Sequence, residues 1–393
     1  MEDGRVRSIS SGLSQKGVRD HNERLLLSLI QRHGEMPASD LAKRAGLSPP
    51  TVSSIMRRLE TEHLVERGEP VRGKVGKPSI PIRLASDGAF SFGLKIGRRS
   101  AELVLIDFNG NLRDERHVTY PAPAPSDIFA FAQDGVASIF SSLPAKVAHR
   151  ICGIGVAAPF EIWNWPENRN DSFFSNWRDV DLQRMISAHT GYDVTLMNDA
   201  TAACQAEHTY GRGKEFRDYA YFFVGAYIGG GIALNNAVYE GRQGNAGALG
   251  SLRTIGPHGE SRQLVDMASI HQLEKRLREV DIPTRQLWDN PQSWHELTRY
   301  VDPWLGQTAQ ELAKAAMSTC SVIDFEAIII DGAFPRQIRE ELVTRVGRYV
   351  ANQDMCGLIP PRIAAGSIGR KARAIGAATR PISAQFMLNA TLD

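Results

Sequence analysis

Three segments in the middle of the chain carry residues suited to binding hydroxyls or phosphates. Asn198 and Asp199 follow the apolar run 194–197, and a carboxylate at the end of a strand can accept a proton from a hydroxyl. The glycine-rich segments 93–97 and 225–231 adjoin apolar runs, and glycine lets backbone N–H groups approach a phosphate or sugar closely. Each feature has a simpler alternative, because Asp199 can cap the following helix and the glycines can be ordinary turns.

Aromatic residues beside polar ones form a second group in the same half of the chain. Segments 160–165 and 173–177 contain Phe and Trp next to Asn and Ser. Aromatic faces pack against sugar C–H faces, although buried core aromatics at the edge of a lobe explain the pattern equally well. The candidate ligand-binding residues are Asn198, Asp199, Gly229, Gly230, Asn245, Ser175 and Asn176.

Near the N-terminus, the apolar spacing predicts three short helices and a hairpin. The helices span 22–33, 38–45 and Pro49 to about His63, and Ser48 is a good N-cap for the third. Apolar segments 64–66 and 79–84 flank a basic, glycine-rich tip. Two short helices joined by a tight turn, followed by a basic hairpin, predict a winged helix-turn-helix that binds operator DNA.

The third helix divides into an inner and an outer face. Val52, Ile55, Met56 and Leu59 repeat at core spacing, so the remaining side chains of its first turns face outward. Short hydroxyls and Arg there suit phosphates and base edges. The candidate DNA-binding residues are Ser48, Pro50, Thr51, Ser53, Ser54, Arg57, Arg72, Lys74 and Lys77. The alternative is a protein-interaction domain whose charge is a solvated face.

The charge distribution agrees with DNA binding by the first domain. Residues 1–85 hold 15 Lys and Arg against 10 Asp and Glu, a net charge of +5, whereas the remainder holds 31 against 34, a net charge of −3. A basic domain attached to a slightly acidic body is typical of a DNA-binding protein.

Composition excludes several other classes of protein. With 393 residues, 42% of them hydrophobic and 23% charged, the chain is neither disordered nor fibrous. Four scattered cysteines favour buried thiols in a reducing compartment over a disulfide framework. The N-terminal region has no long apolar run, so we expect a cytoplasmic protein without a membrane partner.

Beyond residue 85 the pattern changes to strands alternating with helices. We predict strands over 91–96, 101–107, 115–120 and 151–156, and again over 194–197 and 219–224, with further helices over 264–280 and 294–300. Two similar α/β lobes follow from this order. The predicted domains are 1–85, the winged helix-turn-helix; 86–200, the first lobe; and 201–393, the second lobe with the ligand cleft and the oligomerisation surface.

Taken in order, these motifs make the chain resemble the ROK family (repressors, open reading frames and kinases) from Asn22 onward. The segments that carry the resemblance are Arg19-Asp20-His21-Asn22, Leu41-Ala42-Lys43-Arg44-Ala45-Gly46-Leu47-Ser48, Gly76-Lys77-Pro78, Asn198-Asp199-Ala200, Gly229-Gly230-Gly231, Gly244-Asn245-Ala246-Gly247 and Ile330-Asp331-Gly332-Ala333. The resemblance implies an α/β protein in which the winged helix-turn-helix is fused to a two-lobed body of the ATPase type. That body is actin-like and hexokinase-like (ribonuclease H-like) and closes over a sugar.

One departure from the family pattern concerns catalysis. In the family's kinases an Asp helps to arrange metal and phosphate where Lys95 stands here. Mg²⁺ takes oxygen ligands, so Lys95 is expected either to pair with an anionic ligand or to be a surface residue at a strand end. Asp199 matches the family's catalytic base. Without the metal-arranging acid we expect no catalytic residue and no enzyme activity, and Asn198 and Asp199 then serve ligand binding.

A second departure concerns zinc. The resemblance implies a sugar-binding Glu where Ala248 stands and a zinc-ligating His where Ser251 stands, and segment 252–269 lacks the family's zinc cysteines. A lone His258 cannot complete a four-ligand site. We therefore expect no zinc and no other metal or cofactor, and a ligand that differs from plain glucose.

The resulting hypothesis is a sugar-responsive transcriptional regulator that represses carbohydrate uptake or catabolic genes as a homodimer or tetramer. A sugar or sugar derivative would close the lobes and alter operator binding. The alternative is an ATP-dependent sugar kinase of the ROK type with a DNA-binding appendage. A weaker alternative is a regulator without a small-molecule ligand, whose body serves only for dimerisation.

Overall fold

The chain folds into two compact units. The computed structural model describes residues 15–70, 79–164, 176–288 and 294–388. One unit contains the described residues up to Ala85 together with the segment that starts at Ser383, and the other is Ser86–Ile382. The sequence pattern did not indicate that the chain returns to its N-terminal unit at its far end.

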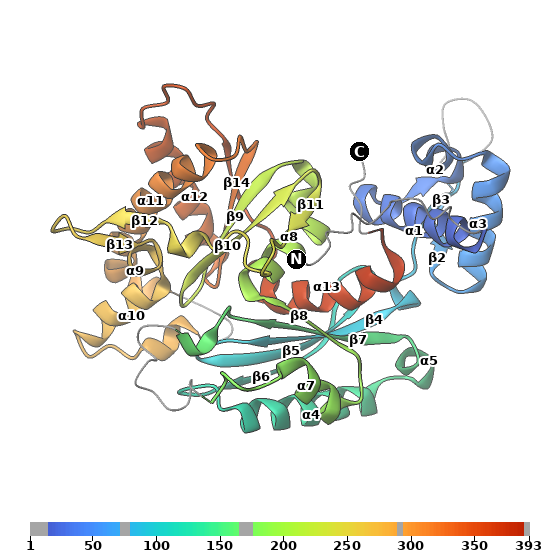
Figure 1. Ribbon diagram of the computed structural model, residues 1–393, viewed down its shortest axis with the longest axis horizontal. Helices are drawn as coiled ribbons and strands as arrows, with labels where there is room; N and C mark the ends of the chain where they lie inside the picture. The colour runs from blue at the N-terminus through green and yellow to red at the C-terminus, as the bar shows by residue number, and fades with distance from the viewer. Residues whose placement is uncertain (1–14, 71–78, 165–175, 289–293, 389–393) are drawn as a thin grey trace, which may run out of the picture. The chain divides into compact units, whose positions relative to one another are not determined.

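The N-terminal unit consists of three helices and a small antiparallel sheet, drawn in blue in Figure 1. Its elements are α1 (Gln15–His33), β1 (Met36–Pro37), α2 (Ala38–Ala45), α3 (Pro49–Thr61), β2 (Val65–Arg67) and β3 (Pro81–Leu84), with sheet order β1-β3-β2. The three predicted helices are confirmed, although α1 begins before Asn22. β1 was not predicted.

Local chemistry explains the turn between α2 and α3. Gly46 adopts φ 64°, a left-handed conformation that glycine accepts at no steric cost, and its N–H donates to the carbonyl of Ala42. The Oγ of Ser48 then accepts a hydrogen bond from the N–H of Thr51 at 3.3 Å, which caps α3, and Pro49 occupies the first helical position.

The C-terminal segment completes the N-terminal unit. Met387 is only 3% exposed, and the N–H of Leu388 donates to the Oγ of Ser28 in α1 at 3.0 Å. The winged-helix unit is therefore built from both ends of the chain.

The first lobe of the larger unit is a five-stranded mixed sheet covered on one face by α4 and α7 (Figure 1). Its elements are β4 (Phe90–Ile96), β5 (Ser100–Asp107), β6 (Leu112–Thr119), α4 (Pro125–Ser142), α5 (Ala145–Ala148), β7 (Ile151–Ala158), α7 (Leu182–Thr190) and β8 (Val194–Asn198). The sheet order is β6-β5-β4-β7-β8. Phe92 and Leu94 point into the core that includes α4.

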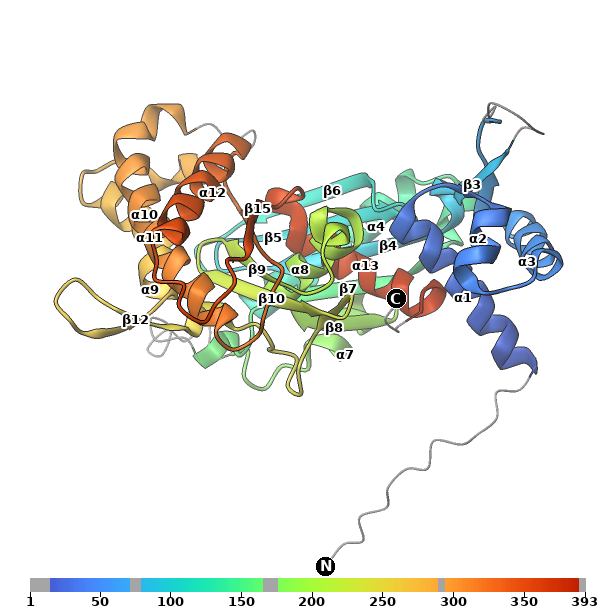
Figure 2. The ribbon, with the colours of Figure 1, turned by 90° about the horizontal axis from the view of Figure 1, so that it is seen from above.

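The second lobe repeats this strand order. Its sheet order is β11-β10-β9-β14-β15. If the strands of each sheet are numbered one to five along the chain, both sheets have the order 3-2-1-4-5. The elements are α8 (Asp199–Tyr210), β9 (Tyr219–Val224), β10 (Ile228–Leu234), β11 (Ala237–Tyr239), β12 (Arg253–Ile255), β13 (Ser261–Gln263), α9 (Val265–Ala268), α10 (Ile270–Arg278), α11 (Thr298–Cys320), β14 (Ala327–Gly332), α12 (Arg336–Ala351) and β15 (Arg362–Ala365). α11 and α12 lie side by side in Figure 2. The prediction of two similar lobes is confirmed.

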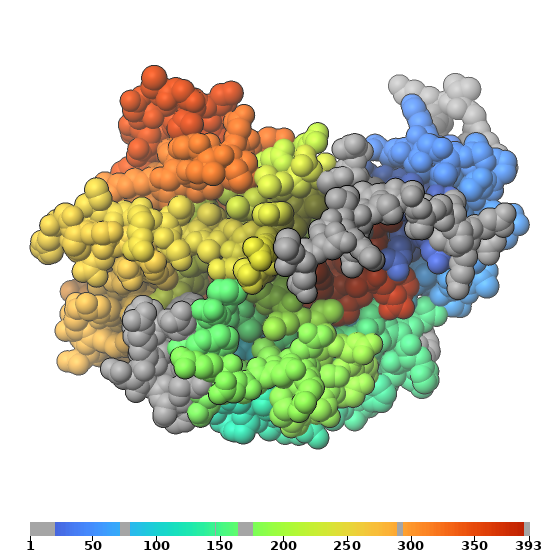
Figure 3. Space-filling model, in the orientation of Figure 1, coloured from blue at the N-terminus to red at the C-terminus, as the bar shows by residue number. Residues whose placement is uncertain are grey.

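The last helix, α13 (Ala372–Phe386), returns to the first lobe. A Cβ atom at Gly93 in β4 would overlap the carbonyl oxygen of Ala374, and one at Gly155 in β7 would overlap that of Ala377. Because Gly93 alternates with Phe92 and Leu94 along the strand, α13 covers the face opposite α4. The lobes therefore differ from the continuous segments 86–200 and 201–393 expected from the sequence. Figure 3 shows their surfaces, with the first lobe in cyan and green below the yellow and orange second lobe.

Two predicted helices are wrong in their bounds. The predicted helix 264–280 is broken at Ser269, which is extended (φ −88°, ψ 156°). Its hydroxyl donates to Val265 and accepts from Ile228, and its carbonyl accepts from the indole of Trp304, so these bonds replace the helical ones. The predicted helix 294–300 is a short 3₁₀ turn followed by α11, which continues through Pro303.

The four cysteines are all free. Cys204 and Cys320 are buried, as expected, whereas Cys152 is partly exposed and Cys356 is exposed. Within the described ranges, no helix combines the length and the apolar character needed to span a membrane.

Candidate functional sites

The outer face of α3 is polar and accessible. Val52, Ile55, Met56 and Leu59 are buried in the unit's core. The exposed side chains on the same helix are those of Pro50, Thr51, Ser53, Ser54 and Arg57. Ser48 is also exposed, but its hydroxyl is engaged with Thr51 as the helix cap. The structure thus brings six of the nine candidate DNA-binding residues onto one helix and its cap, while Arg72, Lys74 and Lys77 lie outside the described residues.

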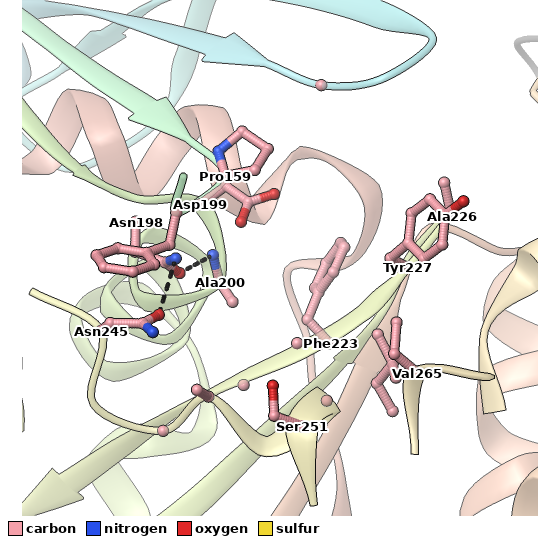
Figure 4. Close-up of a pocket in the computed structure, with 18 of the residues that line it drawn as sticks. Pro159, Asn198, Asp199, Ala200, Phe223, Ala226, Tyr227, Asn245, Ser251 and Val265 are labelled. Atoms are coloured by element: carbon pink, nitrogen blue, oxygen red, sulfur yellow. Dashed lines mark hydrogen bonds between the residues drawn. The ribbon is translucent and has the colours of Figure 1, made fainter. Parts of the chain in front are cut away.

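A cavity of about 540 Å³ opens between the two lobes, a volume within the range of small-molecule sites. Five candidate ligand-binding residues line it together: Asn198, Asp199, Gly229, Gly230 and Asn245. In Figure 4, Asn198 and Asn245 lie on one side of the cavity, Tyr227 on the other, and Phe223 between them. Asn176 is exposed and is not among the lining residues, and Ser175 lies outside the described part of the chain.

The cap of α8 is Asn198 and not Asp199. The Oδ1 of Asn198 accepts hydrogen bonds from the N–H groups of Ala200 at 2.9 Å and Thr201 at 3.2 Å. Its Nδ2 donates to the Oδ1 of Asn245 at 3.5 Å. The alternative role of Asp199 as a helix cap is therefore wrong, because the neighbouring residue fills it, and the Asp199 carboxylate is directed elsewhere.

Asp199 instead forms an ion pair with Arg373 of α13. The Nη1 of Arg373 lies 3.2 Å from the Oδ2 of Asp199, and both side chains are mostly buried. The guanidinium carbon of Arg373 also lies 4.9 Å from the ring centroid of Phe223. Arg373 therefore ties the start of α13 to two lining residues of the cavity.

The glycines of β10 have a packing role as well as a place in the cavity wall. A Cβ atom at Gly229 would crowd the Cβ of Ala200, and one at Gly230 would crowd Leu249 and the carbonyl of Tyr221. The close approach of β10 to α8 therefore requires glycine at 229, and the packing of Leu249 and β9 against β10 requires it at 230, which adds a structural reason for both residues beyond ligand contact.

Lys95 is buried rather than a surface residue at a strand end. It is only 3% exposed, and its Nζ donates to the carbonyl of Ser100 at 3.2 Å and to the Ser100 Oγ at 2.8 Å. The nearest carboxylate oxygen is Oε1 of Glu102 at 3.6 Å. Mg²⁺ requires oxygen ligands, so a buried ammonium at this position does not fit the metal–phosphate chemistry of a kinase.

The pKa of Lys95 gives the body a predicted pH dependence. Burial lowers this pKa from 10.5 to about 8, against the opposing attraction of Glu102. Between these two values the unfolded chain binds more protons than the folded one, so Lys95 makes the free energy of unfolding rise with pH. Relative to Lys95→Met, the wild type should gain about 3 kcal/mol across this window. Urea unfolding at a series of pH values measures the difference, and a constant difference would contradict it.

The β12–β13 hairpin does not offer a zinc site. The backbone N–H of His258 and the Nε of Arg262 both donate to the carboxylate of Glu260 at 3.0 Å. Structural zinc needs four N or S ligands in tetrahedral geometry, and this donor set does not fit it. Across the described ranges of the chain, no three His, Cys, Asp or Glu residues gather as ligands for a metal ion.

Several lining residues of the cavity were not among the candidate ligand-binding residues, and four of them carry charged or aromatic side chains that face one another: Arg98, Phe223, Tyr227 and Arg373. Arg98 follows the first glycine-rich segment directly, so its position in the sequence could have indicated that it lies at the ligand site. Tyr227 lies within the second glycine-rich segment, 225–231, and Phe223 lies two positions before it. Arg373 is 174 residues from Asp199, and nothing in the local sequence indicates that the two meet.

The fold and the cavity define a class of protein: a winged helix-turn-helix joined to a two-lobed, actin-like and hexokinase-like α/β body. The ROK family model matches residues 91–380, and a winged helix-turn-helix DNA-binding model matches residues 19–66. The chain belongs to the ROK family.

Three similar proteins extend this result. An uncharacterised protein, y4fQ, of Sinorhizobium fredii is 24% identical over 95% of this chain and 93% of its own length. The xylose repressor of Bacillus spizizenii is 26% identical over 61% of this chain and 62% of its own length. A solved ROK family transcriptional regulator, a homologue of the E. coli MLC protein, superposes with a TM-score of 0.66 at 18% identity, covering 94% of this chain and 98% of that one.

Proposed function

We propose that this protein is a sugar-responsive transcriptional regulator that represses carbohydrate uptake or catabolic genes. The observation that carries the proposal is the combination of two sites in one chain. An exposed polar face lies on a helix of the DNA-binding type, and a cavity in the body is lined by amide and carboxylate groups able to bond hydroxyls. Similarity to a xylose repressor supports both halves of the proposal.

The proposed mechanism is a shift between open and closed lobes. A sugar bound in the cavity contacts both lobes, so it stabilises the closed arrangement. In a homodimer or tetramer, closure would change the spacing of two winged helices and hence their fit to paired operator half-sites. For sugar binding to change the operator affinity tenfold, the coupling free energy between the two binding events needs to be only about 1.4 kcal/mol. Operator binding would place the protein in the cytoplasm.

A sugar kinase with a DNA-binding appendage is the second candidate, and one observation favours it: the Asp199 carboxylate lines the cavity. Two contacts oppose it. Asp199 is paired with Arg373, and Lys95 occupies the place where metal and phosphate would be arranged. We therefore propose a non-enzymatic body that works without zinc or Mg²⁺. Sugar-dependent ATP hydrolysis in a coupled assay, at rates usual for kinases, would overturn this.

The regulator proposal is tested by selecting the genomic DNA fragments that the purified protein binds. We expect a small set of sites near transporter or catabolic genes, and release of those fragments in the presence of one sugar or sugar derivative. Binding to all fragments alike, or no binding, would contradict the DNA-binding half. Site-specific binding that no sugar alters would contradict the sensor half.

Arg57→Ala should weaken operator binding about tenfold, because an exposed Arg on the outer face of α3 contacts either a phosphate or a base edge. Fluorescence anisotropy over a range of salt concentrations measures the effect. Arg336→Ala, at an 81% exposed arginine of α12, is the matched control and should bind as the wild type does. If wild type and Arg57→Ala bind the operator with equal affinity, Arg57 does not contact the DNA.

A further inference from the structure

Two arginines line the same cavity, each held against an aromatic ring. The guanidinium carbon of Arg98 lies 4.4 Å from the ring centroid of Tyr227, and that of Arg373 lies 4.9 Å from that of Phe223. All four side chains belong to the cavity wall. An arginine over a ring still presents N–H groups at its edge, and that edge matches the oxygens of a carboxylate or phosphate.

A cluster of charged side chains lies behind this wall. Lys95, Arg370 and Arg373 share Glu102 and Asp199, with distances of 3.6 Å from Lys95 to Glu102, 4.0 Å from Arg370 to Glu102 and 3.2 Å from Arg373 to Asp199. These pairs place three cations close to two carboxylates in the part of the chain that the structure describes. An anion bound beside this cluster would be stabilised, because the partly buried site screens the attraction less than water does.

Arg373 has a buried donor for which no acceptor is found in the described part of the chain. Its side chain is 13% exposed, and its Nε is buried without a hydrogen-bond partner among the residues that the structure describes. A buried N–H without an acceptor is costly and is rarely retained without a reason. An anionic oxygen in the cavity would supply the missing acceptor while Nη1 stays with Asp199.

The rest of the wall suits neutral hydroxyls. Asn198 and Asn245 lie across the cavity from Tyr227 (Figure 4). The other lining carboxylates are Glu161 and Asp266, and the exposed Asp266 already accepts a bond from the N–H of Gln263. These groups can bond hydroxyls, whereas the arginines attract an anion, so the charged group of a ligand belongs beside the arginines.

We propose that the ligand of this cavity is an anionic sugar that bears a carboxylate or phosphate group. Arg373 and Arg98 hold the anion, and Asn198, Asp199 and Asn245 bind the hydroxyls. The inference rests on the proposed function, since it names the class of sugar that the regulator senses. Arg373 pairs with Asp199 in the absence of ligand, so the same side chain also keeps the cavity's own acid from repelling the anion.

The test compares matched neutral and anionic ligands on the full chain. Glucose, glucuronate, glucose 6-phosphate and inorganic phosphate are titrated in a thermal-shift assay and by calorimetry. We expect an anionic compound to bind at least about tenfold more tightly than glucose, since bonds to charged groups are worth that much. Glucuronate and glucose 6-phosphate separate a carboxylate ligand from a phosphate ligand, and inorganic phosphate reports the anion position alone.

Variants decide whether the arginines are responsible. Arg98→Gln and Arg373→Gln should each weaken binding of the anionic compounds about tenfold more than they weaken binding of glucose, while Arg336→Gln should alter neither. The inference is overturned if glucose binds as tightly as its anionic counterparts, or if the anions stabilise wild type and the Arg98→Gln/Arg373→Gln double variant equally.

These outcomes remain separable from the proposed function through a DNA-binding readout. If a neutral sugar releases operator DNA, the regulator proposal stands and the anionic class is wrong. If operator binding persists but neither neutral nor anionic sugars alter it, the sensor half of the proposed function fails as well.

Discussion

Replacing Gly155 by alanine is expected to lower the free energy of unfolding of the α/β body by about 3 kcal/mol or more. Gly155 lies in β7, where the added Cβ would overlap the backbone carbonyl of Ala377 in α13. A backbone atom cannot turn aside as a flexible side chain can, so α13 must move away from the sheet. The six tryptophans lie between Trp163 and Trp304, so urea unfolding followed by tryptophan fluorescence reports on this unit alone.

The matched control is Gly347→Ala in α12. No atom lies within 4 Å of a Cβ built there, and alanine is favoured over glycine in a helix interior by about 1 kcal/mol. This variant should be as stable as the wild type or slightly more so. Equal stability of Gly155→Ala and wild type would show that the close approach of α13 to β7 is not maintained.

The second large effect is expected from Met387→Ala, which should destabilise the N-terminal unit by about 2 to 5 kcal/mol and reduce operator affinity accordingly. Met387 is 3% exposed, and its Sδ accepts a bond from the Oγ of Ser28 at 3.8 Å. Residues 1–85 contain no Trp, Tyr or Phe, so the tryptophan transition should stay unchanged. Loss of DNA affinity with an intact tryptophan transition is the predicted signature.

Gln385→Ala serves as the control for Met387→Ala. Gln385 lies in the last turn of α13 and is exposed, so its truncation should change neither DNA affinity nor fluorescence. If Met387→Ala also leaves operator affinity unchanged over the temperature range in which the wild type is folded, the C-terminal segment does not stabilise the DNA-binding unit.

The sequence was sufficient for elements whose chemistry is local. In α3 the core spacing of Val52, Ile55, Met56 and Leu59, with Ser48 as the cap, predicted both the helix and its exposed face. The strands of the two lobes were similarly visible as apolar runs, because buried mixed sheets need near-continuous hydrophobic segments. The repeat of strands and helices along the chain also predicted that the two lobes would be similar.

Features that depend on distant residues could not be predicted. Lys95 looked like a surface residue because lysine is rarely buried, yet Ser100 and Glu102 satisfy its ammonium inside the fold. The helix predicted over 264–280 is broken because the Ser269 hydroxyl and carbonyl bond to β10 and to Trp304. The pairing of Asp199 with Arg373 likewise depends on α13 crossing the first sheet.

The return of the chain to its N-terminal unit also affects the order of events during synthesis. The N-terminal part of a chain leaves the ribosome first, and domains generally fold as units as they emerge. Residues 1–85 emerge well before Met387 and Leu388, which complete their core. A nascent chain therefore carries an unfinished DNA-binding unit until Met387 and Leu388 have been made. A product that stops before these residues would compete poorly for the operator with a chain that contains them.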